Sequence, residues 1–115
     1  MSYTLTKVAE IPQKEKVGLQ INVYSEVDRS GVVVVKTDTG HETEFYHKES
    51  TFTYIVLEGE GTFYLDDEVV PVVAGDQLTI DPMTRIYYRG TLRLALLTTP
   101  PWREENEVTT KEKAW

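Results

Sequence analysis

The hydrophobic residues of the chain come in short runs, and this pattern predicts an all-β fold. The runs are rich in Val, Ile, Thr, Tyr and Phe, whereas helical periodicity is weak throughout. Turn residues such as Thr39-Gly40, Gly59-Glu60-Gly61 and Asp81-Pro82 separate the runs. Many short strands at close spacing are typical of a β-sandwich or a closed barrel. The expected strands are 4–8, 19–25, 32–38, 42–47, 53–58, 61–65, 68–72, 77–80, 85–88 and 92–98.

The length of the chain, 115 residues, indicates one domain over 1–115 with one hydrophobic core. The core barrel is expected at about 17–101, because Pro100 and Pro101 cannot donate hydrogen bonds to a neighbouring strand. Residues 102–115 are charged and mixed in polarity, so a surface tail or a short terminal helix is expected there. Trp102 is expected to pack this tail onto the barrel.

Two strands that are apolar on both faces predict a homodimer. Val32–Val35 and much of Leu94–Leu97 present apolar side chains in both directions, and such strands are covered on both faces. In a small barrel a second subunit would cover the outer face, whereas the alternative is a sandwich layer within one chain. Arg93 is expected on the outer face. An inward Arg93 would instead suggest a carboxylate or phosphate ligand.

Composition narrows the classes of site and partner. The chain has no cysteine, which excludes a disulfide scaffold, a cysteine-ligated zinc site and a thiol nucleophile. It has two histidines, too few for a site of three imidazoles, and a formal net charge of -7, which argues against nucleic-acid binding. The N-terminus lacks the pattern of a signal peptide, and no stretch is apolar enough to span a membrane. A cytoplasmic protein with no membrane partner is therefore expected.

Three motifs follow one another between Gly40 and Pro101. They are YIVLEGEG over 54–61, FYLDDEVVPV over 63–72 and AGDQLTIDP over 74–82. In this order and spacing they resemble the cupin superfamily, a group of small barrel proteins. The resemblance implies a double-stranded β-helix, which is a jelly-roll barrel.

The resemblance also implies where a metal would bind. Cupins typically hold a metal with two histidines spaced by one residue, a glutamate, and a third histidine in the second motif. Aligned on the glycines at 59 and 75, these positions carry Phe45, His47, Phe52 and Ile86. Three of the four are apolar and cannot bind a metal. We therefore expect no metal and no cofactor at these positions.

The same positions imply an apolar pocket inside the barrel. Strand alternation places His41 and His47 on one face with Phe45, and the resemblance points this face inward. His41 lies beside the turn after Gly40, so it is expected to be exposed. The leading hypothesis is binding of a small, partly apolar molecule without a metal. The expected lining is Phe45, His47, Phe52, Tyr54, Ile86 and Tyr88.

Enzymatic hypotheses remain open beside this one. In a metal-independent isomerase or epimerase, His47 would remove a proton next to a carbonyl, and Tyr54 or Tyr88 would return it or stabilise charge. A structural His47 is equally consistent with the sequence, as are tyrosines that merely fill the barrel mouth. A metal-dependent cupin enzyme would need a variant site made of His41, His47 and Glu49. A barrel that binds no ligand and acts as a dimerisation or regulatory partner is the last alternative.

Overall fold

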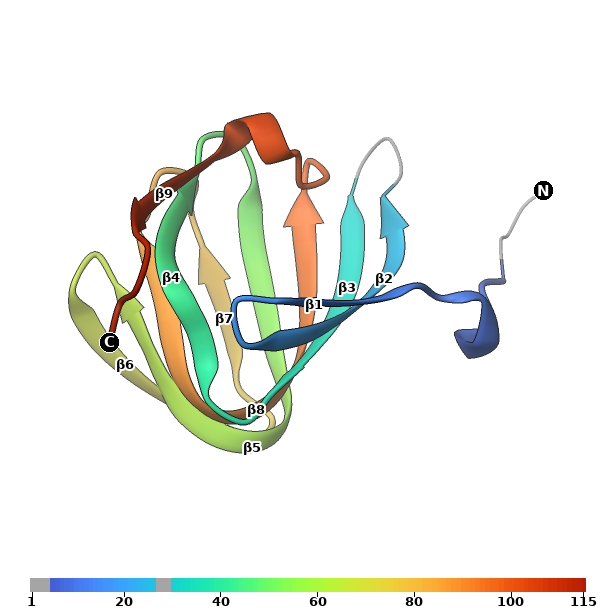
Figure 1. Cartoon of the computed structure of the whole chain (residues 1–115), viewed down its shortest axis with the longest axis horizontal. Helices are drawn as coiled ribbons and strands as arrows, with labels where there is room; N and C mark the ends of the chain where they lie inside the picture. Colours follow the sequence, from blue (N-terminus) through green and yellow to red (C-terminus); the bar gives the residue numbers. More distant parts are fainter. Residues whose placement is uncertain (1–4, 27–29) are drawn as a thin grey trace.

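The computed structural model of the chain describes residues 5–26 and 30–115 (Figure 1). Within these residues, nine antiparallel strands form one strongly curled sheet. The prediction of an all-β barrel is confirmed. The elements are η1 Val8–Glu10, β1 Gln13–Lys16, β2 Leu19–Glu26, β3 Gly31–Thr37, β4 Gly40–His47, β5 Thr51–Leu65, β6 Glu68–Val73, β7 Gln77–Ile80, β8 Ile86–Thr99, η2 Glu104–Asn106 and β9 Glu107–Lys111.

Two long strands, β5 and β8, hold the barrel together. They pair along almost their whole length, from Thr51↔Thr99 to Leu65↔Ile86. β8 also pairs with β3 through its second half and with β4 through its first half, while β5 pairs with β6 and β7. Because both long strands contact several neighbours along their length, the sheet must curl and enclose the core. β1 and β9 lie at the two ends of the path β1-β2-β3-β8-β4-β9.

The prediction of a turn at Gly59-Glu60-Gly61 is wrong, because β5 continues through it. Gly59 has a φ of +86°, and a Cβ there would clash with the carbonyl oxygen of Thr91. The pairing of β5 with β8 shifts register between Val56 and Glu58, so the strand bends without ending. Gly90, at φ +142°, lies opposite Gly61 in β8. These positions join each of the two pairs of predicted strands, 53–58 with 61–65 and 85–88 with 92–98, into one element.

The chain ends also differ from expectation. Residues 5–7 have no regular structure and Val8–Glu10 form a 3₁₀ turn, so no strand forms there; residue 4 lies outside the described range. The segment expected as a tail contains β9, which pairs with β4, for example at His47↔Glu107. β9 and β1 are edge strands with few apolar residues, so they are held by backbone hydrogen bonds that hydrophobic patterning does not reveal. In the described part of the chain, no helix is long and apolar enough to cross a membrane.

The core fills the barrel with aromatic and aliphatic side chains. The rings of Phe63 and Tyr88 lie 4.6 Å apart, and those of Tyr54 and Phe63 lie 5.0 Å apart at an edge-to-face angle. Such contacts add specific stabilisation to the burial of apolar area. The buried apolar residues are Leu19, Val35, Phe45, Phe52, Tyr54, Val56, Phe63, Val72, Ile80, Ile86, Tyr88, Leu92 and Leu94.

The outer face of β3, β8 and β5 carries neighbouring apolar side chains. Val34 pairs with Ala95 and Val32 with Leu97, while Ala95 pairs with Ile55 on the other side. Ile55 and Leu97 are exposed. Arg93 lies on the same outer face and forms an ion pair with Glu58 at 3.6 Å, so it does not reach the barrel interior. The homodimer stays a prediction, and the outer face of β3, β5 and β8 is its expected interface.

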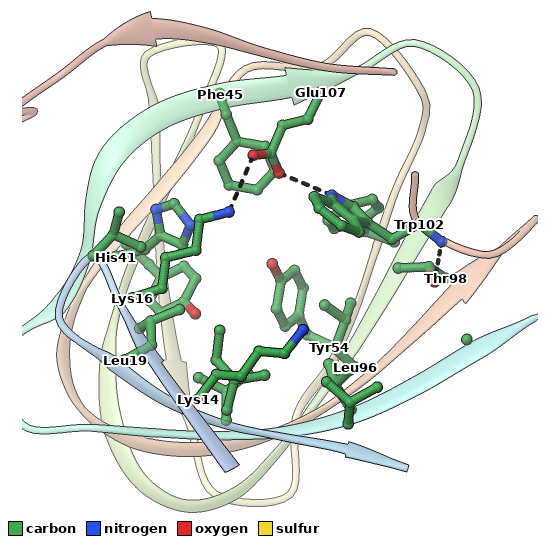
Figure 2. Close-up of a pocket in the computed structure, with 18 residues that line it drawn as sticks. Lys14, Lys16, Leu19, His41, Phe45, Tyr54, Leu96, Thr98, Trp102 and Glu107 are labelled. Carbon is green, nitrogen blue, oxygen red and sulfur yellow. Dashed lines mark hydrogen bonds and ion pairs between the residues drawn. The ribbon is translucent and has the colours of Figure 1, made fainter. Parts of the chain in front are cut away.

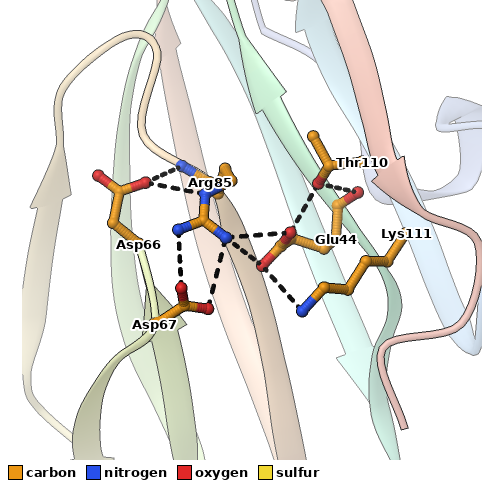
Figure 3. Close-up of polar contacts among 6 residues, drawn as sticks. All are labelled: Glu44, Asp66, Asp67, Arg85, Thr110 and Lys111. Atoms are coloured by element: carbon orange, nitrogen blue, oxygen red, sulfur yellow. Dashed lines mark hydrogen bonds and ion pairs between the residues drawn. The ribbon is translucent and has the colours of Figure 1, made fainter.

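A charged network outside the barrel holds β9 against β4 (Figure 3). The carboxylate of Glu44 is 1% exposed and accepts a hydrogen bond from Thr110 Oγ1 at 2.7 Å. Arg85 Nη1 lies 3.4 Å from the same carboxylate and also reaches Asp67, while Lys111 Nζ lies 4.0 Å away. Glu44 thus ties β4 to the strand that carries Glu107 to the barrel mouth.

Candidate functional site

One end of the barrel holds a cavity of about 150 Å³ (Figure 2). Its walls are mostly apolar and come from β2, β3, β4, β5 and β8, with Phe45 and Phe52 among them. The polar groups in the walls are few, as in most small-molecule sites: His41, Tyr54, Tyr88 and Thr98. Lys14, Lys16, Trp102 and Glu107 form the rim, with the two lysines exposed.

His41 presents an unprotonated ring nitrogen to this cavity. Its Nδ1 lies 2.8 Å from the carbonyl oxygen of Thr43. Since a carbonyl only accepts, Nδ1 carries the proton and Nε2 keeps its lone pair in the neutral ring. Nε2 has no hydrogen-bond partner among residues 5–26 and 30–115. Since every fully buried side-chain nitrogen or oxygen in these residues has a partner, Nε2 is not fully buried. Nε2 is therefore accessible from the cavity.

The surroundings keep His41 neutral. Burial lowers the pKa of His41 from 6.5 to about 4; the hydrogen bond to Thr43 opposes this, and the positive charge of Lys16 adds to it. The ring is held by Phe45, 4.7 Å away between centroids, and by Tyr88, 5.6 Å away. The expectation that His41 is exposed is therefore corrected. Its position beside the turn did not reveal that Trp102 and residues of β1 and β9 line the same cavity.

Tyr54 and Tyr88 supply two hydroxyl groups to the same cavity. The two side chains are 2% and 1% exposed. Neither hydroxyl has a protein partner among the described residues, so each reaches the open space of the cavity, and Figure 2 shows that of Tyr54 pointing into it. Burial raises the pKa of both phenols, and for Tyr54 the charges of Tyr88 and Glu107 add to the effect. Both hydroxyls therefore stay protonated and can donate hydrogen bonds to a ligand.

His47, the histidine expected in the pocket, does not line this cavity. Its Nδ1 accepts hydrogen bonds from the backbone N–H of Ser50, at 3.0 Å, and of Glu49, at 3.3 Å. Its Nε2 lies 3.3 Å from the carbonyl oxygen of Arg103. Both ring nitrogens are thus occupied by backbone groups that connect the β4–β5 loop to the segment before η2. The expected place of His47 is corrected, since the ring faces the interior beyond the end of the cavity.

Of the other residues expected in the pocket, four line the cavity and one does not. Phe45, Phe52, Tyr54 and Tyr88 line the cavity, whereas Ile86 is buried in the core and does not. Ile86 pairs with Phe45 on β4 and with Leu65 on β5.

The rim was not foreseen from the sequence. Glu107 Oε1 accepts a hydrogen bond from Trp102 Nε1 at 3.0 Å, and Glu107 Oε2 lies 3.9 Å from Lys16 Nζ. The Lys16 ammonium also lies 5.3 Å from the centroid of the Trp102 ring, within cation–π range. Trp102 packs against the core, as predicted. The alternation of Lys14 and Lys16 in a polar segment was the only available signal.

Comparison with known proteins places the chain in a family. The family described as Cupin domain matches residues 31–97. The chain belongs to the cupins. Among curated proteins, an uncharacterised protein of Aquifex aeolicus is 35% identical over 66 residues, which are 57% of this chain and 52% of that protein. The chain thus spans about half the length of this curated relative.

Among solved structures, this cupin is similar to Pac13 along the whole of both chains. A structure of Pac13, described as a unique nucleoside dehydratase, is 35% identical, with a TM-score of 0.90 and full coverage of both chains. A Streptomyces Pac13 variant with uridine is 33% identical, with a TM-score of 0.92 and the same coverage. KdgF from Halomonas is 18% identical over 90% of this chain and 98% of its own, with a TM-score of 0.77, and shows the fold alone.

The metal site that the cupin fold implies does not fit the residues present. Three of its four positions are Phe45, Phe52 and Ile86, and the fourth, His47, has both nitrogens engaged by the backbone. The variant site of His41, His47 and Glu49 does not assemble either, since Glu49 accepts a hydrogen bond from Asn106 at 2.9 Å. The residues that the structure describes bring together no group of three His, Asp or Glu side chains able to hold a metal ion.

Proposed function

We propose that this cupin is a nucleoside dehydratase, an enzyme that eliminates water from the sugar of a nucleoside derivative without a protein-bound metal. The observation that carries the proposal is the cavity itself. His41 Nε2 and the hydroxyls of Tyr54 and Tyr88 line the same cavity, and none of them has a hydrogen-bond partner among the residues that the structure describes. Polar groups left free inside an apolar cavity are suited to a ligand that supplies their hydrogen bonds.

The similarity to Pac13 supports the choice of reaction and substrate class. Three Streptomyces Pac13 structures with uridine each carry one substitution, at one of two different tyrosines or at a histidine. Those are the residue types that supply the free polar groups of this cavity. The similarity covers both chains completely, so the barrel and both edges that form the rim are included.

The chemistry follows from the state of His41. Its neutral imidazole can remove a proton from a sugar carbon next to a carbonyl, which leaves the electron pair on the substrate as an enolate. The apolar surroundings that lower the pKa of His41 make its imidazolium a strong acid. The imidazolium can then give the same proton to the leaving hydroxyl, so that the C–O bond breaks and water departs. His41 returns to its neutral state, and the atoms balance.

Tyr54 and Tyr88 act as hydrogen-bond donors in this scheme. Because burial raises the pKa of each phenol, both stay protonated. A protonated hydroxyl can stabilise the negative charge that develops on the carbonyl oxygen when the proton leaves. Phe45 and Phe52 supply aromatic surface against which a flat base can pack. The base of the metal-independent hypothesis thus becomes His41 in place of His47.

The test combines binding with turnover. Calorimetry measures uridine binding, and mass spectrometry follows the loss of one water from uridine derivatives whose sugar carries a carbonyl. His41→Gln is expected to reduce turnover about 100-fold or more, and Tyr54→Phe or Tyr88→Phe roughly tenfold or more. Tyr64→Phe is the matched control, since Tyr64 stacks on Tyr87 outside the cavity lining.

The outcomes separate the hypotheses. Absence of binding by uridine and by every uridine derivative tested, or pocket variants that behave like Tyr64→Phe, would rule out the proposal. Binding that depends on His41 and the tyrosines, with no product from any derivative, would favour the barrel that only binds a small molecule. The cytoplasmic location stays a prediction.

A further inference from the structure

We infer that the rim of the cavity binds an anionic group, so that the ligand is a nucleoside derivative carrying a phosphate or a carboxylate. The inference rests on the proposed function and adds the charge class of the substrate. It concerns Lys14 and Lys16, which are not among the reacting groups assigned above.

The strand β1 places two lysine side chains at the rim of the cavity. Lys14 and Lys16 are two residues apart in β1, so they share a face, and both line the cavity. Their partners on β2 are Ile21 and Leu19, which also line the cavity. The alternate residues Gln13 and Glu15 do not, so the charge that would compensate the lysines lies on the other face.

The two lysines have little competition for an anion. Lys14 has no ion-pair partner among the described residues, and Lys16 reaches Glu107 only at 3.9 Å. Glu107 is also occupied by the indole N–H of Trp102. The rim thus carries two positive charges and one negative charge, although the whole chain has a net charge of -7. The lowering of the His41 pKa by Lys16 indicates that this positive charge is felt inside the cavity.

The geometry sets which part of the ligand carries the charge. Tyr88 lies in the walls of the cavity. Figure 2 shows His41 and Tyr54 in the walls as well, whereas the lysines lie on an exposed edge strand. A sugar placed against His41 would leave the end of the ligand that faces solvent near the lysines. A phosphate or carboxylate there would receive charge-assisted hydrogen bonds from both ammonium groups.

The test compares uridine with two charged relatives, uridine 5′-monophosphate and the uridine derivative whose 5′ carbon is a carboxylate. Calorimetry at low salt measures binding to wild type, Lys14→Gln and Lys16→Gln. Lys36→Gln is the matched control, an exposed strand lysine outside the cavity lining. Circular dichroism and thermal melting establish that each variant is folded.

At least one charged ligand is expected to bind wild type about tenfold tighter than uridine or more, because the two ammonium groups add charge-assisted hydrogen bonds to its binding. Lys14→Gln and Lys16→Gln are expected to reduce this advantage several-fold, and Lys36→Gln to leave it unchanged. Added salt should weaken it at the exposed rim. The charged ligand with the larger lysine-dependent gain identifies the anion class.

Three other results would overturn the inference. Uridine that binds as tightly as both charged relatives would refute it while the proposed function stands. A charged ligand that binds tighter but equally so to all three lysine variants would place the anion elsewhere. Failure of uridine and of both charged relatives to bind would refute the proposed function, and the inference with it.

Discussion

His41 makes the stability of this barrel depend on pH in a window where few other groups titrate. The folded chain binds a proton at His41 only near pH 4, whereas an unperturbed histidine does so near 6.5. Between these values the unfolded chain binds more protons than the folded chain, so stability falls as pH falls through the window. Above pH 6.5 the stability from neutral His41 is fully present, and a pKa change from 6.5 to about 4 corresponds to about 3 kcal/mol.

Urea unfolding at a series of pH values from 7.5 to about 4 measures this quantity. Carboxylates also titrate at the acid end, so the informative number is the difference between wild type and His41→Gln, which lacks the titrating ring. From pH 7.5 to 4, the free energy of unfolding of wild type is expected to fall by about 3 kcal/mol more than that of His41→Gln. Most of this change should occur below about pH 6. NMR titration of the His41 ring gives the midpoint directly. A midpoint near 6.5, or wild-type and variant curves that stay parallel, would refute the burial and hydrogen bonding assigned to this ring.

Three further predictions concern the barrel. Glu44→Ala removes a buried hydrogen-bonded carboxylate, so the free energy of unfolding should fall by about 2 kcal/mol and the melting temperature by about 8 °C. Asp67→Asn, on the exposed side of the same network, should leave the melting temperature nearly unchanged. Equal effects of the two substitutions would contradict the role of burial. Gly59→Ala should destabilise by at least about 2 kcal/mol more than Gly75→Ala, because both have positive φ but only Gly59 abuts a carbonyl oxygen. Light scattering should find a dimer that Leu97→Asp dissociates, and a wild-type monomer at micromolar concentration would reject the homodimer.

The core of this fold could be predicted because its strands bury apolar residues with a period of two. β7 was predicted at its exact bounds of Gln77–Ile80, and β3 and β4 to within two residues at either end. The merger of two pairs of strands into β5 and β8 was missed for a physical reason. Gly59 serves a close approach to Thr91 inside a paired strand, and a glycine in this role looks the same in sequence as a glycine in a turn.

The candidate site could likewise be predicted from the sequence only in part. Alternation correctly placed His41, Phe45 and His47 on the inward side of β4, since side-chain parity follows from the strand itself. Depth along the barrel axis does not follow from parity. His47 lies outside the cavity lining, and its ring is hydrogen-bonded to the backbone of Ser50 and Arg103. His41 lies in the lining, together with Lys14, Lys16 and Glu107 of the edge strands β1 and β9.

The edge strands β1 and β9 explain why hydrophobic patterning in the sequence is weakest at the rim of the cavity. β1 and β9 contribute little to the apolar core, and backbone pairing with β2 and β4 holds them in place. Polar residues on such strands are free to vary without unfolding the barrel, since their side chains are not core contacts. Lys14, Lys16 and Glu107 lie on these strands and form the rim of the cavity. Under the proposed function, substitutions at the rim would therefore change specificity while His41, Tyr54 and Tyr88 stay in place on the paired strands β4, β5 and β8.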